Sequence, residues 1–468
     1  MSRLRVACLL AGALAVGACG NAQPSVSPTA TPRTSTAPSG ANPTASPIGG
    51  LVRWCDYVPG NPVATVPPRD LPDFPLPPMP SRTAVAAATT RQQLEIVNDL
   101  WRAIDRNYVD PAATGAQWDA VRTKYREIVG RGIAEDDFHT VLDLMIAELG
   151  DEHSFVESPE EAAAAEAELE GQTDYAGIGA LMNATDDGTS IFIIAVWPDS
   201  PARRAGLHAH DRVVRVDGQS PVDEQGIPRV ELVRGQPGTH VTLTVERPGE
   251  PARDVEVERA RIQGSTPVDL CVIPGTRILY VGLVSLFDRL EDEQLRAALE
   301  ALAPGGPVDG IILDNRMNTG GASDVLESFL ELFVDGRVGE FRSPSDTRSF
   351  EIDGIDIAGS QAAPLVVLVG LDTVSFGEIM SGTLQAVDGA KVVGETTGGN
   401  VETLYGYDLP HDWQAWIAHE TFEATGATYG PWEDTGIIPD RIVPGRWDAF
   451  TSATDPALPV ALELLGVR

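Results

Sequence analysis

Lysine is nearly absent from this chain of 468 residues. Of its 34 lysine and arginine residues only Lys124 and Lys391 are lysines, and 68 aspartate and glutamate residues bring the formal net charge to −34. Nucleic acids and anionic lipid surfaces bind proteins through basic patches, which this charge does not favour. The composition therefore argues against a nucleic-acid partner, and it leaves only two side chains that could serve as an amine base.

Cysteine is also scarce, with four residues, of which Cys8 lies in an N-terminal targeting segment. Two arginines precede an apolar run, residues 6–16, that is too short to anchor the chain across a bilayer. The next residues, "VGAC" ending at Cys19, resemble a bacterial lipobox. That resemblance implies removal of residues 1–18, lipid attachment to Cys19 and a place on the outer face of the bacterial cell membrane. The alternative, an ordinary secretory signal with a chance cysteine, also predicts export.

Residues 19–85 are expected to form a lipidated tether followed by an extended segment. Residues 20–50 contain no aromatic side chain and consist almost entirely of small and polar residues and proline, a composition that predicts a flexible tether. Residues 51–85 carry aromatic side chains and are expected to pack onto a domain. Cys55 and Cys271 remain as an even pair in an oxidising compartment, so a disulfide and two separately buried thiols both stay open.

A helical subdomain is expected over residues 86–170. Leu94, Val97, Trp101, Ile104 and Tyr108 recur at the spacing of one helix face, and two further runs repeat that pattern before Gly150. The Ala/Glu-rich stretch 159–170 predicts a solvated helix or linker. Residues 266–468 alternate buried strands, such as "PLVVLVG", with amphipathic helices, such as "EDEQLRAALEAL". That alternation predicts an α/β layer architecture.

Short strands and turns between these two regions, over residues 171–265, resemble a PDZ domain. The resemblance is carried by "SPARRAGLHAHDRVVRVDG", residues 200–218, and it implies capture of an extended C-terminal peptide by strand addition. Gly177, Ile178 and Gly179 would form the loop whose N–H groups receive the terminal carboxylate, and Leu181 would line an apolar groove wall. The alternative is a glycine-rich turn in an ordinary small β-domain.

Ser375, in "DTVSFGEIMSG", stands where a buried strand passes into a helix. The stretch Ser375-Phe-Gly-Glu378 is a capping box, so the serine could be purely structural. Two other segments supply the remaining parts of a serine hydrolase: Gly320-Gly321 after another buried strand, and His153 just past a helix end. Ser375 is therefore either a catalytic nucleophile or only the cap of a helix.

These segments, with "VVGETTGG" and "WEDTGIIPDRIV", resemble peptidase family S41 over about residues 88–448 and in the family's order. The resemblance implies a crotonase-like α/β catalytic domain with an inserted PDZ domain. One branch of the family uses a Ser-Lys dyad, but here the lysine position holds Asn400. The tricorn-like branch uses serine, histidine and glutamate, and it implies Ser375 as nucleophile, His153 as base and Glu433 as the residue that orients the base.

The oxyanion hole is expected from the N–H groups of Gly321 and Phe376, with Gly320 as the second choice for the first donor. His411 and His419 are reserve candidates for the base. Asp314 and Arg316 either contact substrate or form a structural ion pair that holds the Gly-Gly loop. The spacing of His208 and His210 suggests a metal only weakly.

No HExxH, phosphate-loop or CxxC pattern is present, so we expect no cofactor and no metal. The sequence thus predicts an exported, lipid-anchored serine endopeptidase that cleaves proteins or peptides recruited by their C-termini. A catalytically degenerate, PDZ-type peptide-binding lipoprotein is the main alternative. A serine esterase or amidase stays open as well.

Overall fold

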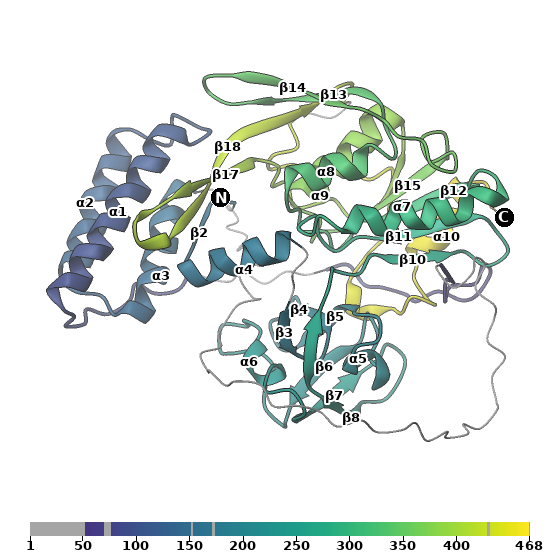
Figure 1. Cartoon of the computed structure of the whole chain (residues 1–468), viewed down its shortest axis with the longest axis horizontal. Helices are drawn as coiled ribbons and strands as arrows, with labels where there is room; N and C mark the ends of the chain where they lie inside the picture. The colour runs from purple at the N-terminus through teal and green to yellow at the C-terminus, as the bar shows by residue number, and fades with distance from the viewer. Residues whose placement is uncertain (1–51, 70–75, 151–152, 171–173, 428–430, 468) are drawn as a thin grey trace, which may run out of the picture.

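The computed structural model describes residues 52–69, 76–150, 153–170, 174–427 and 431–467. Figure 1 shows three parts: a helical unit at one side, a large α/β part at the other, and a small β-rich part below them. The predicted signal segment, the tether and Cys19 lie outside the described residues. Within the described ranges, no helix is both long and apolar enough to span a bilayer.

The α/β part is built on a seven-stranded sheet in the order β1-β10-β11-β12-β15-β16-β19. All neighbouring pairs are parallel except β10 with β11. Its central strands β12 and β15 are buried at every position, as expected for a parallel sheet covered on both faces. The strands are β1 (Arg53–Trp54), β10 (Asp269–Val272), β11 (Ile278–Gly282), β12 (Gly310–Asp314), β15 (Leu365–Val369), β16 (Lys391–Gly394) and β19 (Arg441–Ile442).

Helices cover both faces of this sheet, as Figure 1 shows. Because successive strand residues point to opposite faces, Ile311 and Val367 join the core beneath α7, α8 and α9, whereas Ile312 and Val366 join the core beneath α10. The helices are α7 (Glu291–Leu302), α8 (Ser323–Leu330), α9 (Phe376–Thr383) and α10 (Ala457–Leu464). Short helical turns are η2 (Ala303–Gly305), η3 (Leu384–Asp388) and η5 (Trp447–Ala449). The expected α/β class is confirmed.

A second sheet joins the α/β part to the helical unit. It runs β14-β13-β18-β17, and β2 pairs with β18. The strands are β2 (Phe155–Glu157), β13 (Gly336–Arg342), β14 (Thr347–Ile352), β17 (Thr403–Asp408) and β18 (Gln414–Ala424). The helical elements are α1 (Ala87–Asn107), α2 (Ala116–Gly130), α3 (Glu135–Ile146), η1 (Ala147–Leu149), α4 (Pro159–Leu169) and η4 (Pro410–Asp412).

The core of the helical unit is completed by residues from far along the chain. Ile104 and Leu142 of the helices share one cluster with Ala415 and Ile417 of β18. The sequence pattern showed the apolar helix faces, and the structure shows that the β17–β18 hairpin covers them.

The PDZ-like part has its own apolar core around Ile193, Val213 and Leu243. Its five-stranded sheet has the order β4-β5-β6-β7-β8, with a separate β3–β9 pair. The elements are β3 (Asp174–Gly177), β4 (Ala180–Ala184), β5 (Ile191–Val196), α5 (Pro201–Arg204), β6 (Arg212–Val216), α6 (Val230–Val233), β7 (His240–Glu246), β8 (Arg253–Glu258) and β9 (Ala260–Gln263). Within the residues that the structure covers, β4 is an edge strand.

The first described residues of the segment before the helical unit pack onto the α/β part. Strand β1 pairs with β10, and Tyr57 is buried. Cys55 and Cys271 form a disulfide with a Cα–Cα distance of 4.9 Å. Of the two readings that the sequence left open, the disulfide is confirmed.

Candidate active site

Ser375 and the Gly320-Gly321 loop meet at one edge of the central sheet. Strands β12 and β15 are parallel neighbours, so their carboxyl ends, and the loops that follow them, lie side by side. A Cβ added to Gly320 would lie 2.6 Å from Ser375 Cβ and 2.9 Å from the Phe376 nitrogen. Only glycine therefore permits this approach of the two loops.

Ser375 is the N-cap of α9, with φ 56° and ψ −130°. This backbone conformation is rare for a residue with a Cβ and costs on the order of 1–3 kcal/mol, which is often retained at functional sites. The Ser375 side chain makes no capping hydrogen bond. The predicted capping function of the hydroxyl is therefore wrong, although the N-cap position is right.

The Glu378 carboxylate, the other half of the predicted capping box, is buried and holds a neighbouring loop. It accepts hydrogen bonds from the Thr397 hydroxyl and, at 2.8 Å each, from the N–H groups of Gly399 and Asn400. Burial raises the pKa of Glu378, although these hydrogen bonds lower it. The loop in turn contacts the serine, because the Ser375 N–H donates to the Asn400 carbonyl at 2.8 Å. Asn400 therefore lies directly beside Ser375.

The expected oxyanion donors differ in their availability. The Gly320 N–H already donates to Asn318 Oδ1 at 2.9 Å, so the second-choice donor is engaged elsewhere. Phe376 is the first residue of α9, where N–H groups have no partner within the helix. Gly321 has φ 156°, and a Cβ there would lie 2.2 Å from the Leu286 carbonyl. This leaves Gly321 and Phe376 as the candidate pair.

Glu433 lies on the far side of the loop that carries Asn400. Its Oε2 accepts hydrogen bonds from the N–H groups of Val401 at 2.8 Å and Glu402 at 3.2 Å. Burial raises the pKa of Glu433 to about 7, and the nearby carboxylates of Asp434 and Glu378 act in the same direction. Residues 399–402 thus connect Ser375 to Glu433 through consecutive backbone contacts.

His153 directly precedes the segment that forms β2. Ala418 of β18 donates its N–H to Ser154 Oγ at 3.0 Å, and Ala418 pairs with Leu404 of β17. Strand β17 begins just after Glu402, so Ser154, the neighbour of His153, contacts β18 close to the start of the strand that follows the Glu433 contacts.

The reserve histidines have other contacts. The His411 Nε2 lies 3.1 Å from Glu95, and the His419 Nδ1 lies 2.9 Å from the Tyr407 hydroxyl while its ring stacks on Tyr405. His210 is buried against Trp447 and Phe450. In the described ranges, no cluster of three or more His, Cys, Asp or Glu side chains could hold a metal ion.

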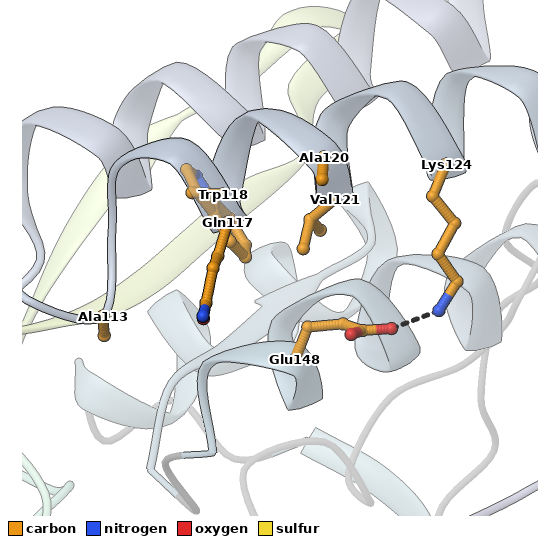
Figure 2. Close-up of a pocket in the computed structure, with 7 residues that line it drawn as sticks. All are labelled: Ala113, Gln117, Trp118, Ala120, Val121, Lys124 and Glu148. Carbon is orange, nitrogen blue, oxygen red and sulfur yellow. Dashed lines mark hydrogen bonds and ion pairs between the residues drawn. The ribbon is translucent and has the colours of Figure 1, made fainter.

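Both lysines lie away from Ser375. Figure 2 shows Lys124 on α2, paired with Glu148 at a pocket of the helical unit, and Figure 1 shows α1 and the β17–β18 hairpin between α2 and α9. Lys391, at the start of β16, is exposed and lies 3.7 Å from Asp440. The structure therefore offers no lysine beside the serine.

Two asparagines that were not predicted from the sequence hold together the loops that follow β12 and β15. Asn318 accepts from Gly320 through its side chain and, through its carbonyl, from the Val374 N–H at 3.1 Å. The Asn315 carbonyl accepts from the Thr373 hydroxyl at 2.7 Å. Both lie in "LDNRMN", and their position after a buried strand was the signal that could have indicated them.

The structural alternative for Asp314 and Arg316 is confirmed. Both side chains are 2 % exposed, and the Arg316 guanidinium lies between the carboxylates of Asp314 and Asp455. Tyr280 donates its hydroxyl to Asp314 at 2.7 Å. A charge buried to this extent is stable only when it is paired in this way.

The predicted carboxylate loop of the PDZ-like part has the required close packing. Gly179 has φ 77°, and a Cβ there would lie 2.4 Å from Ser200 Cβ. The Tyr175 phenol lies close to this loop. Burial raises its pKa to about 12, whereas Arg234 and the N–H groups of Gly179 and Ala180 lower it. Ile178 is buried in the core of this part, and Gly177 ends β3 beside the Tyr175 ring.

Leu181, predicted to line an apolar groove wall, lies on the side of β4 that faces away from the core of the PDZ-like part. Side chains alternate along a strand, and Ala180 and Met182 of β4 contact the core of the PDZ-like part. Leu181 instead contacts a cluster shared with the α/β part, which contains Phe192 and Trp447. Ala180 and Met182 are therefore the apolar side chains of β4 that face this core.

Ser375 has a strained backbone and lies beside a glycine loop, on an α/β sheet with an attached PDZ-like part. This arrangement is typical of the serine hydrolases, a class of enzymes. Comparison with known proteins narrows this class. Residues 277–443 match peptidase family S41, residues 192–247 match the PDZ domain and residues 91–147 match the Tricorn protease C1 domain. The chain thus contains a serine peptidase domain of family S41 and a PDZ domain.

The chain is similar to a carboxyl-terminal-processing protease of Picosynechococcus sp., with 28% identity over 81% of this chain and 91% of the relative. It is also 28% identical to the carboxy-terminal processing protease CtpA of Bacillus subtilis, over 64% of each. Among solved structures, a photosystem II D1 C-terminal processing protease aligns with TM-score 0.53 and 24% identity over 77% of this chain and 94% of its own. These relatives belong to the carboxyl-terminal processing group of the family.

Proposed function

We propose that this protein is an exported, lipid-anchored serine endopeptidase that cleaves proteins or peptides through Ser375, His153 and Glu433. The observation that carries the proposal is the pairing of Ser375 with Asn400. The residue in the lysine position of the dyad branch lies beside the serine, and it is an asparagine, which cannot act as a base. Another base is needed, and imidazole is the usual choice.

In this mechanism Ser375 Oγ attacks the scissile carbonyl carbon while His153 takes its proton. The bond to the leaving amine then breaks as His153 returns that proton, and water hydrolyses the acyl-enzyme by the same route. Glu433 orients the imidazole and stabilises the imidazolium. The N–H groups of Gly321 and Phe376 bind the oxyanion, and the N-terminus of α9 favours the negative charge that develops there.

Two observations support His153 as the base. The match to the Tricorn C1 domain ends six residues before it, in agreement with a tricorn-like arrangement. Strand register also brings the segment containing His153 to the middle of β18, opposite the start of β17, which directly follows the two residues held by Glu433, Val401 and Glu402. A glutamate with a pKa near 7 would be returned to its ionised form by a neighbouring imidazolium.

Substrate recruitment by C-termini rests on the PDZ domain. Strand β4 is an edge strand that could pair with an extended peptide, and the loop at Gly179 and Ala180 directs N–H groups toward one end of it. The named relatives are carboxyl-terminal processing proteases. We therefore expect substrates with free, apolar C-termini. Export and the lipid anchor rest on residues 1–19 and agree with the Cys55–Cys271 disulfide.

The test is incubation of the purified protein with an unfolded protein substrate. Ser375→Ala and His153→Ala should each reduce turnover by at least about 10²-fold, and the double variant should be little worse, because the residues act as one unit. Asn400→Ala should retain activity within about an order of magnitude. Turnover that survives His153→Ala but collapses in Asn400→Ala would contradict the triad.

The same assay separates the alternatives. Peptide binding without cleavage by the wild-type protein would favour the degenerate, peptide-binding lipoprotein. Hydrolysis of small esters or amides without cleavage of any protein would favour an esterase or amidase.

A further inference from the structure

Residues 64–69 lie between the PDZ domain and the α/β part. Val66 is buried in a cluster that takes Phe192 and Ile194 from the PDZ domain and Trp447 and Phe450 from the α/β part. The Ala64 N–H donates to the Thr454 carbonyl at 2.7 Å. We call residues 64–69 the strap, because they contact both parts at once.

The strap ends at Arg69, whose guanidinium bridges two aspartates from different parts. Arg69 Nε donates to Asp186 Oδ2 at 2.9 Å, and Arg69 Nη1 donates to Asp372 Oδ2 at 2.5 Å. The side chain of Arg69 is only 8% exposed, and those of Asp186 and Asp372 are 14% and 28% exposed. Planar guanidinium groups suit such two-sided carboxylate pairing, which a lysine could not reproduce.

Both aspartates occupy functional positions. Asp186 lies two residues after the end of β4, the edge strand proposed to pair with substrate. Asp372 lies three residues before Ser375, in the loop between β15 and α9. Arg69 is thus the link between the peptide-binding hairpin and the loop that carries the nucleophile.

The negative charges around Arg69 make its guanidinium important for holding the two loops together. Glu395 belongs to the same group: burial raises its pKa, Arg69 lowers it, and Asp372 and Asp186 raise it. Arg69 therefore pairs with two carboxylates and lies near a third. Without Arg69, the like charges of Asp186 and Asp372 would repel each other in a partly buried setting, and the two loops would separate.

We propose that Arg69 is a positioning residue for the reaction: it fixes the loop before Ser375 and ties that loop to the β4–β5 hairpin of the PDZ domain. The inference rests on the proposed nucleophilic role of Ser375. The physical reason is that a displacement of a nucleophile by about 1 Å is enough to lower its reactivity by up to about 10²-fold.

The test measures the reaction of Ser375 with a fluorophosphonate probe. In this reaction the Ser375 Oγ–P bond forms, the P–F bond breaks, fluoride leaves, and the hydroxyl proton passes to the base. The amplitude of labelling reports the fraction of folded enzyme, and the rate constant reports how well the nucleophile is positioned. A residue that only stabilises the fold would change the amplitude and leave the rate constant unchanged.

We expect Arg69→Met to lower the labelling rate constant about tenfold or more, and Arg69→Lys to restore part of it. Arg53→Met is the matched control, since Arg53 lies in the same N-terminal segment and pairs with Asp269 at 2.7 Å on the surface. This control should stay within about twofold of the wild-type rate constant. Asp186→Asn should also slow labelling, because it removes the anchor on the PDZ domain.

An unchanged rate constant in Arg69→Met, with or without a loss of amplitude, would overturn the proposal. An unchanged rate constant in Asp186→Asn would overturn the link to the PDZ domain. Labelling that persists in Ser375→Ala would show that Ser375 is not the nucleophile, so the proposed function would fail first and the role of Arg69 with it.

Discussion

At the scale of single residues, the site combines a strained serine with a buried acid. Ser375 is held at φ 56° by the hydrogen bond from its N–H to Asn400 and by the close approach of Gly320. Glu433 is held by two N–H groups, yet burial still raises its pKa to about 7. Both features destabilise the fold, and both suit a catalytic role.

The raised pKa of Glu433 predicts how one substitution changes stability with pH. The unfolded chain loses this proton near pH 4.5 and the folded chain near pH 7, so wild-type stability falls by up to about 3 kcal/mol as pH rises through that window. Glutamine stays neutral and can still accept from Val401 and Glu402. Glu433→Gln should therefore unfold at higher urea than wild type at pH 8, with the two curves converging below pH 4.5, while kcat falls.

Equal urea midpoints of the wild type and Glu433→Gln at pH 8 would show that Glu433 is not a strained, ionised group in the fold. Retention of full kcat by this variant would contradict the orienting role of the carboxylate.

At the scale of elements, the β3–β4 junction of the PDZ domain holds a phenol that would compete with the proposed C-terminal ligand. The Tyr175 phenol faces the N–H groups of Gly179 and Ala180, and the Arg234 guanidinium lies 5.1 Å from the centre of the Tyr175 ring. A peptide carboxylate would need the same N–H groups. Binding of a C-terminus at this loop would therefore require the phenol oxygen to move.

Tyr175→Phe should strengthen binding of a C-terminal peptide, because the ring is kept and the competing oxygen is removed. We expect a several-fold lower Kd for a free-acid peptide with an apolar last residue, measured by fluorescence anisotropy. The amidated peptide should bind weakly to both forms. Equal affinity of acid and amide for the wild type would remove C-terminal recognition, whereas an unchanged Kd in Tyr175→Phe would remove only the competition by the phenol.

At the scale of the whole molecule, the PDZ domain is docked on the α/β part through an aromatic cluster. The His210 ring stacks on Trp447 with centroids 4.2 Å apart, and its Nδ1 lies 2.9 Å from the Trp447 carbonyl. Burial lowers the pKa of His210 to about 4, although the Trp447 carbonyl and Asp455 favour the charged form; Arg316 disfavours it. The docked state therefore holds a neutral imidazole.

This interface should weaken in acid. Between pH 6.5 and pH 4 the unfolded chain binds a proton at His210 and the docked chain does not. The free energy of unfolding therefore decreases by up to about 3 kcal/mol as the pH is lowered through this range. His210→Phe should be less stable than wild type at pH 7.5 but should lose less stability between pH 7 and pH 4.5. His240→Phe, at the exposed start of β7, is the control. Parallel losses in wild type and His210→Phe would contradict this source of acid sensitivity.

The sequence by itself determined the kind of elements, their order and the central part of the site. Apolar periodicity indicated the helices and the buried strands, and the glycine and serine positions at strand ends indicated the loops that meet at Ser375. These are local properties, because backbone preference and side-chain spacing are set by neighbouring residues. The scarcity of lysine and the identity of Asn400 were equally visible in the sequence.

The tertiary structure alone decided what each element packs against. It placed β18 over the helical unit, turned Leu181 toward the cluster that contains Trp447 and directed the Glu378 carboxylate to the loop at Asn400. It also joined Arg69 to Asp186 and Asp372, which lie 117 and 303 positions away along the chain. Such contacts leave no periodic trace in the sequence, because they depend on the simultaneous packing of segments that have no local influence on one another.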